Sequence, residues 1–187
     1  MNSENNFFSS LAQLLVTHAR EARDDTELEL QPPATIEEIL AFEKKIGVKF
    51  PEQLKLTYSL VGDGEHRKNS TGVLGGDSWA SLGDILCNYD FHDQDDPFGN
   101  QPDVWESVNE VKQGQVWRKE WIPIGSGYDN RFIYIDTDPS DEGKVGQVLF
   151  AQHVDYSFGV LAPSIKEFWE LVLSRSDYSR NWNGPGS

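Results

Sequence analysis

The chain contains 187 residues, of which 37% are hydrophobic and 12% aromatic, so a domain with a packed core is expected rather than a disordered chain. Its 31 aspartates and glutamates outnumber its 16 lysines and arginines, which gives a formal net charge of −15. A charge of this sign repels nucleic acid and anionic membranes and attracts basic partners, although acidity also serves ordinary solubility. We therefore expect binding to neither nucleic acid nor membrane.

Cysteine content and apolar runs bear on the compartment. Cys87 is the single cysteine, so the chain can form neither an internal disulfide nor a thiolate metal cluster. No apolar run approaches the ~18 residues of a membrane-spanning helix. The first residues also lack the basic start of a signal peptide. These features predict a cytoplasmic protein.

Two helices are predicted near the N-terminus. Residues 7–22 place apolar side chains three or four positions apart, which is the pattern of an amphipathic helix. After a Pro-Pro break, Thr35 and Glu38 have the spacing of a capping box, and Gly47 is suited to the residue that ends a helix. The second helix is therefore expected between Thr35 and Gly47.

A third helix is predicted to start at once. Pro51 suits its first turn and Gly62 its end, and we expect Phe50 at the junction to pack inward. Beyond this helix the apolar period changes. The segments expected there are a short strand or turn at 72–76, an element of undetermined type at 79–88, a polar loop at 89–103 and a candidate helix at 106–117.

The last third of the chain favours strands followed by a helix. Strands are predicted at 121–124, 131–136 and 147–153. Ser164 and Glu167 form a second capping-box pattern, which opens a closing helix. The order of elements indicates an α+β fold with a small, mostly antiparallel sheet packed with helices. We expect three parts, namely an N-terminal helix extension (1–29), the domain itself (30–178) and a flexible tail (179–187).

Asp136 and Asp138 directly follow an apolar run and raise the question of catalysis. An EF-hand starting at Asp136 would need glycine and glutamate where Asp141 and Gln147 stand, so the calcium loop is excluded. A phosphatase of the Asp-x-Asp type draws further motifs from a long following stretch, and too little chain remains after Asp138. Turn residues after the pair and the apolar run at 145–150 favour a hairpin instead.

A cation site remains an alternative to the hairpin. The residues that could join the pair are His92, Asp93, Asp95, Asp96, His153 and Asp155. Acidic loops are more often simply solvated, and the histidines lack the spacing of metal ligands. We therefore expect no metal site and no cofactor.

Other catalytic patterns are missing from the sequence. There is no Gly-x-Ser-x-Gly elbow, and Cys87 has only His92 near it in the sequence. Gly125-Ser126-Gly127 is too short for a phosphate-binding loop and opens no evident helix. No residue is assigned as catalytic, and the chain is not expected to be an enzyme.

Four segments, taken in order, resemble the SUKH superfamily, which includes the fungal Smi/Knr cell-wall assembly regulator and many bacterial immunity proteins. They are "PPATIEEILAFEKKIGVKFPEQLKLTYSLVGDG" (32–64), "GVLGGDSWASLGDI" (72–85), "WIPIGSGYDNRFIYIDTDPSDEGKVGQVLFAQH" (121–153) and "VLAPSIKEFWELV" (160–172). The resemblance covers about 30–175. The chain departs from the usual pattern where Val61-Gly62-Asp63-Gly64 replaces an Asn-Gly stop.

The resemblance implies an α+β protein without enzymatic activity that acts by binding another protein. Bacterial members commonly neutralise a toxin, often a nuclease, delivered between neighbouring cells. Nuclease domains bind phosphate and tend to be basic, which agrees with the separate argument from charge. The function expected here is therefore immunity against a basic toxin domain of a polymorphic or contact-dependent toxin system. The alternative is a regulatory or scaffold protein of the Smi/Knr type.

Two sets of residues follow from this interpretation. The first matches the family pattern and is expected to be structural: Trp121, Pro123, Gly125, Asp136, Asp138, Pro139, Gly143 and Gly146. The second combines acidic and aromatic side chains that we expect to contact the partner: Asp90, Asp93, Asp95, Asp96, Phe98, Trp105, Tyr128 and Asp129.

Overall fold

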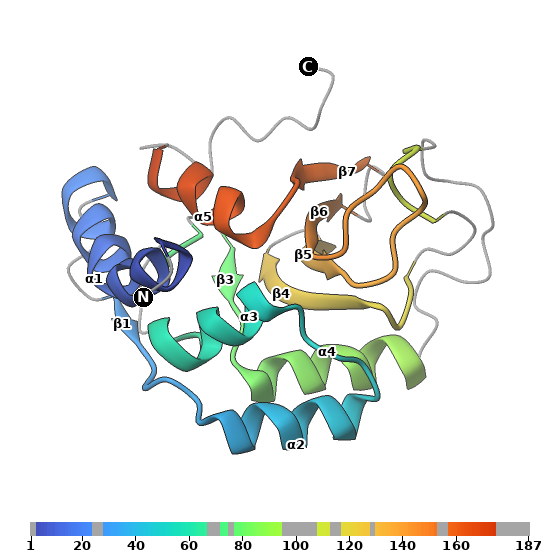
Figure 1. The fold of residues 1–187 in the computed structure, drawn as a ribbon, viewed down its shortest axis with the longest axis horizontal. Helices are drawn as coiled ribbons and strands as arrows, with labels where there is room; N and C mark the ends of the chain where they lie inside the picture. Colours follow the sequence, from blue (N-terminus) through green and yellow to red (C-terminus); the bar gives the residue numbers. More distant parts are fainter. Residues whose placement is uncertain are drawn as a thin grey trace.

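The computed structural model describes residues 3–23, 28–66, 72–74, 77–94, 108–112, 117–127, 130–152 and 157–174. Its main feature is a five-stranded antiparallel sheet in the order β3-β4-β5-β6-β7. The strands are β3 (Ser78–Trp79), β4 (Trp121–Gly127), β5 (Arg131–Asp136), β6 (Gln147–Gln152) and β7 (Ser157–Ala162). Figure 1 shows α1 (Ser3–Arg23) and α5 (Ile165–Ser174) to the left of the sheet, with α2 (Ile36–Ile46) and α4 (Leu82–Gln94) beneath it. The predicted α+β class is confirmed.

The predicted start and end of α2 are both confirmed. The Thr35 side chain accepts a hydrogen bond from the backbone N–H of Glu38, and the Glu38 carboxylate accepts one from the backbone N–H of Thr35. Gly47 ends the helix with φ 73°, a left-handed conformation that glycine adopts without steric cost. Local side-chain chemistry therefore fixes both ends of this helix.

The third helix begins where expected but changes its winding. Glu52–Leu56 is α-helical (α3), and Thr57–Val61 continues it as a π-helix (η1) up to Gly62. The Thr57 hydroxyl donates to the carbonyl of Gln53 at 2.8 Å, a bond that competes with the regular helical ladder. The wider turn places Tyr58 and Val61 in the core. The spacing of apolar residues alone did not predict this insertion.

Strands β4, β5 and β6 pair as a meander at the predicted positions. The register between β4 and β5 shifts between Pro123 and Gly125, so the ladder contains a bulge there. Proline has no N–H to donate, and bulges are one of the few places where a sheet accommodates it. A separate two-stranded ladder joins β1 (Glu29–Leu30) to β2 (Glu65–His66).

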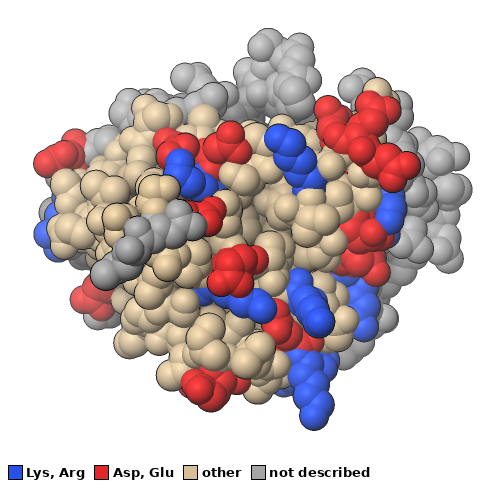
Figure 2. Space-filling view, in the orientation of Figure 1, with Lys and Arg blue, Asp and Glu red and all other residues tan. Residues whose placement is uncertain are grey.

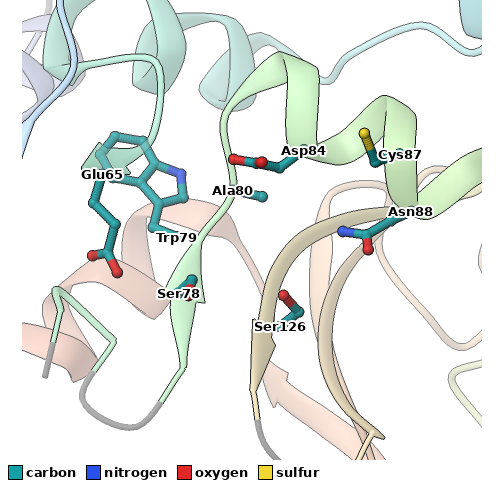
Figure 3. Close-up of a pocket in the computed structure, with 8 residues that line it drawn as sticks. All are labelled: Glu65, Ser78, Trp79, Ala80, Asp84, Cys87, Asn88 and Ser126. Atoms are coloured by element: carbon teal, nitrogen blue, oxygen red, sulfur yellow. The ribbon is translucent and has the colours of Figure 1, made fainter. Parts of the chain in front are cut away.

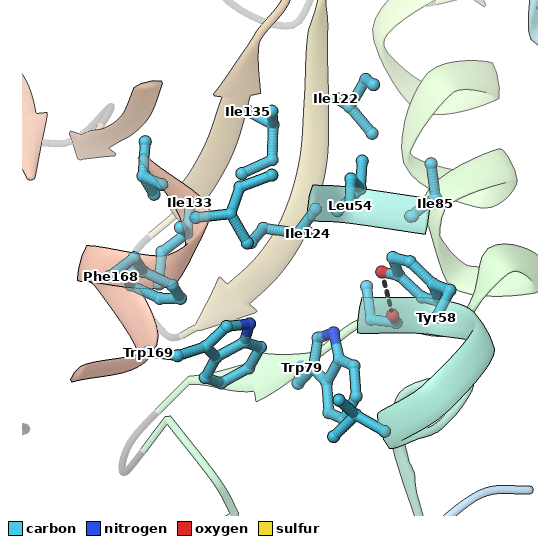
Figure 4. Close-up of a cluster of buried hydrophobic side chains, with 14 of the residues drawn as sticks. Leu54, Tyr58, Trp79, Ile85, Ile122, Ile124, Ile133, Ile135, Phe168 and Trp169 are labelled. Atoms are coloured by element: carbon cyan, nitrogen blue, oxygen red, sulfur yellow. Dashed lines mark hydrogen bonds between the residues drawn. The ribbon is translucent and has the colours of Figure 1, made fainter. Parts of the chain in front are cut away.

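The sheet is buried on both faces. One face carries isoleucines such as Ile122, Ile133 and Ile135 into the main core, which the five α-helices also enter. The opposite face carries Phe132 and Tyr134 into a second cluster with Val111. Alternate side chains of a strand point to opposite faces, so β5 supplies both cores. Figure 4 shows the main core, where the Tyr58 hydroxyl donates to the carbonyl of Ala80 at 2.7 Å.

A chain of aromatic contacts crosses the main core. Its successive ring pairs have centroids 5.2 to 5.9 Å apart, in edge or tilted arrangements that aromatic quadrupoles favour. The rings in order are those of Phe42, Phe50, Tyr58, Trp79 and Trp169. They come from α2, the α2–α3 junction, η1, β3 and α5. The chain therefore joins elements that are far apart in the sequence.

Several predictions of secondary structure are wrong. Residues 89–94, expected in a loop, form the end of α4, because Tyr89 is buried and its hydroxyl donates to the carbonyl of Lys119 at 2.8 Å. Residues 108–112 form turns rather than part of a helix. Val145 is 68% exposed in a turn rather than in the returning strand. Strands β3 and β7 were not predicted, and the first residues matched to the closing helix belong to β7.

Helix α1 belongs to the same core as the rest of the fold. Phe8, Leu11, Leu15 and Ala19 are buried on its inner face, at the spacing of an amphipathic stripe. The expected division between an extension (1–29) and a domain (30–178) remains a prediction. The tail proposed at 179–187 lies outside the described residues.

Replacing Phe50 by alanine should destabilise the fold. Phe50 is only 4% exposed and contacts the rings of Phe42 and Tyr58, as the prediction of an inward-facing side chain required. Removing such a ring should cost about 3–5 kcal/mol of unfolding free energy, measured by chemical denaturation. Lys49→Ala, at the exposed neighbouring position, is the matched control. A midpoint unchanged from wild type would contradict this packing.

Candidate interaction surface

Asp136 is the last residue of β5, and its carboxylate is fully buried. One carboxylate oxygen accepts the backbone N–H of Asp138 and the other accepts the side-chain amide of Gln147, each at 3.0 Å. Gln147 opens β6 and is the register partner of Asp136. The same amide group donates to the carbonyl of Glu110 at 2.9 Å, and its oxygen accepts the N–H of Lys144. Asp136 and Gln147 thus hold both ends of the β5–β6 connection.

Burial and hydrogen bonding act on Asp136 in opposite directions. Loss of water raises the pKa of this carboxyl above its usual range. The bonds from Asp138 and Gln147 and the charge of Arg118 lower the pKa, but burial is the larger effect. The ionised form is therefore less favoured in the folded protein than in the unfolded chain.

Asp138 faces outward and is paired with two cations. Its carboxylate contacts the ammonium of Lys112 and the guanidinium of Arg118, the latter at 2.8 Å. Arg118 also donates to the backbone carbonyl of Asp138 at 3.1 Å. Hydrogen bonds from Lys112 and Arg118 lower the pKa of Asp138. The two aspartates therefore have different environments and different partners.

The glycines of the matched pattern occupy places where a side chain would not fit. A Cβ at Gly143 would lie 2.1 Å from the carbonyl oxygen of Glu110, and Gly146 has φ 87°. Trp121 and Gly125 are buried in β4, Pro123 adjoins the bulge, and Pro139 lies in the connection. These placements agree with a structural role for this set, which remains a prediction.

Three segments meet at the end of the molecule where β4 begins and β5 ends. They are the last turns of α4, residues 117–120 and the β5–β6 connection (137–146). Tyr89 of α4 bonds to the carbonyl of Lys119, and Thr137 donates twice to the carbonyl of Glu120, at 2.8 and 3.0 Å. We call this region, together with residues 108–112 that contact it, the acidic end surface. Its exposed or half-exposed acids are Asp90, Glu110, Glu120, Asp138, Asp141 and Glu142, and its cations are Lys112, Arg118, Lys119 and Lys144. In Figure 2 acidic atoms gather at the upper right, where Figure 1 places the connection.

The expected contact residues are only partly described. Asp90 is exposed on α4, and Asp93 lies in the same helix. Asp95, Asp96, Phe98, Trp105, Tyr128 and Asp129 lie outside the described residues. Gly127 and Asn130, which flank positions 128 and 129, lie at the opposite end of β4 and β5 from Trp121 and Asp136. The expected contact set remains a prediction.

Sequence reasoning missed the groups that hold this surface in place. Lys112 and Arg118 pair with Asp138 across 26 and 20 positions, and Gln147 reaches Glu110 across 37. Such bonds leave no local spacing from which to infer them. The sequence did mark Asp136 and Asp138 themselves, through their match to the family pattern.

The described residues contain neither a metal-ligand cluster nor a membrane-spanning helix. These residues contain no cluster of three or more His, Cys, Asp or Glu side chains able to hold a metal ion. Within the same ranges, no helix combines the length and apolar character needed to span a bilayer.

Fold and surface together define a single-domain α+β protein whose most organised polar groups fix a strand connection rather than surround a ligand. The chain belongs to the SMI1/KNR4 family (SUKH-1), whose model matches residues 33–170. The SUKH resemblance is thereby confirmed. No curated protein matches the chain. Members of this family are in general regulatory or immunity proteins that act through protein–protein interaction and not as enzymes.

The stability contribution of Asp136 should depend on pH. Its folded-state pKa is raised, so the folded protein binds this proton more readily than the unfolded chain does. Its contribution to stability is then greatest in acid and declines as pH rises through the folded pKa. We expect the free energy of unfolding of wild type minus that of Asp136→Asn to fall as pH rises from about 4, near the usual pKa of an aspartate, toward neutral pH.

The measurement is urea denaturation of both proteins across this pH range. Asp141→Asn is the matched control, because it removes an exposed carboxylate from the same connection. A difference that grows with pH would contradict the burial of an ionisable Asp136.

Proposed function

We propose that this protein is a non-enzymatic immunity protein that binds and neutralises a basic toxin domain, such as a nuclease of a polymorphic or contact-dependent toxin system. The observation that carries the proposal is the acidic end surface, on a chain of net charge −15 that belongs to a family of protein-binding domains. Complementary charge accelerates encounter and suppresses wrong partners. The proposed site of action is the cytoplasm, where a toxin delivered from a neighbouring cell would be met.

The structure of the connection supports a surface of this kind. Asp136 and Gln147 fix its ends, and Arg118 fixes Asp138 by two bonds. Side chains held before binding lose less conformational entropy on binding, so a rigid acidic surface is better suited to tight association than a mobile one. Asp141 and Glu142 are exposed on this connection and are available to a cationic partner.

A second candidate is a regulatory or scaffold protein of the Smi/Knr type. The matched family carries the name of that regulator, which favours this reading as much as immunity. The two functions differ in partner, because a scaffold binds a resident protein of the same cell and an immunity protein binds an incoming toxin.

The immunity function predicts rescue. A toxin domain encoded next to this gene should kill cells when expressed alone and spare them when this protein is co-expressed. Because inhibition is by binding, titration of the purified toxin activity should end at one-to-one stoichiometry rather than continue as a catalytic decay. Equal death with and without this protein, together with no complex in pull-down at low salt, would favour the scaffold function.

The kinetics of the complex should depend on charge. Raising salt from ~50 to ~500 mM should slow association more than it speeds dissociation. Replacing Asp93, Asp95 and Asp96 together by asparagine should lower the association rate constant roughly tenfold if the segment that contains these residues faces the toxin. The measurement is surface plasmon resonance or stopped-flow fluorescence.

A matched control separates local contact from total charge. The triple variant Glu29→Gln, Glu37→Gln and Glu52→Gln also removes three negative charges, but from exposed positions on β1, α2 and α3. Equal slowing by both triple variants would show that net charge, rather than local contact at positions 93, 95 and 96, steers the encounter.

A further inference from the structure

A pocket of about 300 Å³ opens between α4 and the β3–β4 edge of the sheet. Its lining residues are Glu65, Ser78, Trp79, Ala80, Asp84, Cys87, Asn88 and Ser126. Figure 3 shows the Asn88 amide of α4 and the Ser126 hydroxyl of β4 directed toward one another across this space. The family match and the acidic end surface assign no role to this pocket.

Among the described residues, the pocket lining contains two carboxylates and no lysine, arginine or histidine. Glu65 is only 7% exposed, and the backbone N–H of Val73 fixes one of its oxygens at 2.6 Å. Asp84 uses one oxygen to cap α4, where it accepts the N–H and the hydroxyl of Ser81 at 2.9 and 2.7 Å. The other carboxylate oxygen of Asp84 accepts no hydrogen bond from the described residues. It is therefore available as an acceptor at the rim of the pocket.

Two further charged residues of the described chain, Asp63 and Arg131, lie near the pocket. Burial, and to a lesser extent the charge of Asp84, raise the pKa of the adjacent Asp63. Arg131, the cation beside the β4 edge, is bonded to Asp77 at 2.6 and 3.0 Å. A guanidinium held by its own carboxylate does little to offset Glu65 and Asp84.

Neutral polar groups complete the site. Ser78 and Ser126 are register partners across β3 and β4. In the described part of the chain, the side chains of Ser78, Ser126 and Asn88 form no hydrogen bond. Oxygen acceptors from three elements therefore converge on one space, which is the donor–acceptor complement of an ammonium or guanidinium group.

We propose that this pocket binds a protonated amine or guanidinium group, carried by a lysine or arginine side chain of the protein partner. The attribution to a partner rests on the proposed function, whereas the preference for a cation rests on the pocket. Asp90 lies one turn beyond Cys87 on α4, so a partner seated on the acidic end surface could reach the pocket along this helix. The pocket would then add a specific contact to a surface that otherwise attracts by charge.

Cys87 allows a direct test on the isolated protein, because it is the single cysteine and lines the pocket. Its rates of modification by a cationic and an anionic methanethiosulfonate reagent are measured and expressed as a ratio. The reference is the same ratio measured at an exposed thiol outside the pocket, in a protein of the same net charge. The double variant Cys87→Ser, Ser10→Cys provides it, because Ser10 is exposed. We expect the ratio at Cys87 to exceed the reference roughly fivefold to tenfold.

Variants identify the charges responsible. Asp84→Asn and Glu65→Gln each remove a charge and keep a side-chain oxygen that can accept the backbone N–H of Ser81 and of Val73, respectively. Each should lower the ratio about twofold to threefold. Asp84 is exposed, so its variant keeps the test valid if Glu65→Gln fails to fold. A wild-type ratio equal to the reference, or unchanged in Asp84→Asn, would overturn the proposal.

Ligand protection distinguishes the source of the cation. N-acetyl-arginine amide should slow modification of Cys87 by a neutral methanethiosulfonate, and the uncharged isostere N-acetyl-citrulline amide should not. Protection by putrescine without protection by the arginine amide would assign the pocket to free amines and overturn the attribution to a partner side chain. Equal protection by both amides would overturn the cation preference itself. None of these measurements needs the toxin, so they stand or fail apart from the rescue experiment.

Discussion

Strand β5 is buried on both faces, and this double burial is the constraint on which the rest of the structure depends. Ile133 and Ile135 require helices on one side, while Phe132 and Tyr134 require cover on the other. The hydrophobic effect supplies most of the stability of such an arrangement, because apolar area on both faces leaves water. Helices α1 to α5 provide the first cover, and Val111 and neighbouring residues contribute to the second. The chain must therefore pass around the end of the sheet to reach both faces. The charged β5–β6 connection (137–146) lies at that end.

The end of β5 is also where the apolar environment meets charge. A buried carboxylate is costly unless its oxygens are bonded, and both oxygens of Asp136 have partners. The bond to Gln147 ties the strand ends together, and the bond to Asp138 turns the chain outward. Arg118 and Lys112 then anchor Asp138. In this way the same few residues that close the hairpin also fix the orientation of the acidic end surface.

Much of this fold could be predicted from local sequence. Thr35 and Glu38 predict the start of α2, and Gly47 predicts its end, because helix capping depends on residues that are close in the chain. The continuous apolar run before Asp136 gave β5 its correct bounds. The end of α4 was missed because its polar composition resembles a loop, and the tertiary contact of Tyr89 outweighs that local preference. The ion pairs of Asp138 and the pocket around Cys87 depend on residues brought together by the fold, and no spacing in the sequence could indicate them.

The aromatic chain through the main core has a spectroscopic consequence. Trp79 and Trp169 meet edge to face with ring centroids 5.2 Å apart, although they belong to β3 and α5. Two indoles held at a fixed mutual angle couple their strong electronic transitions, so we expect this pair to contribute an exciton signal to the far-ultraviolet circular dichroism of the protein. That signal exists only while α5 is docked against β3. The protein thereby contains an intrinsic optical reporter for the closure of its core, which requires neither label nor ligand.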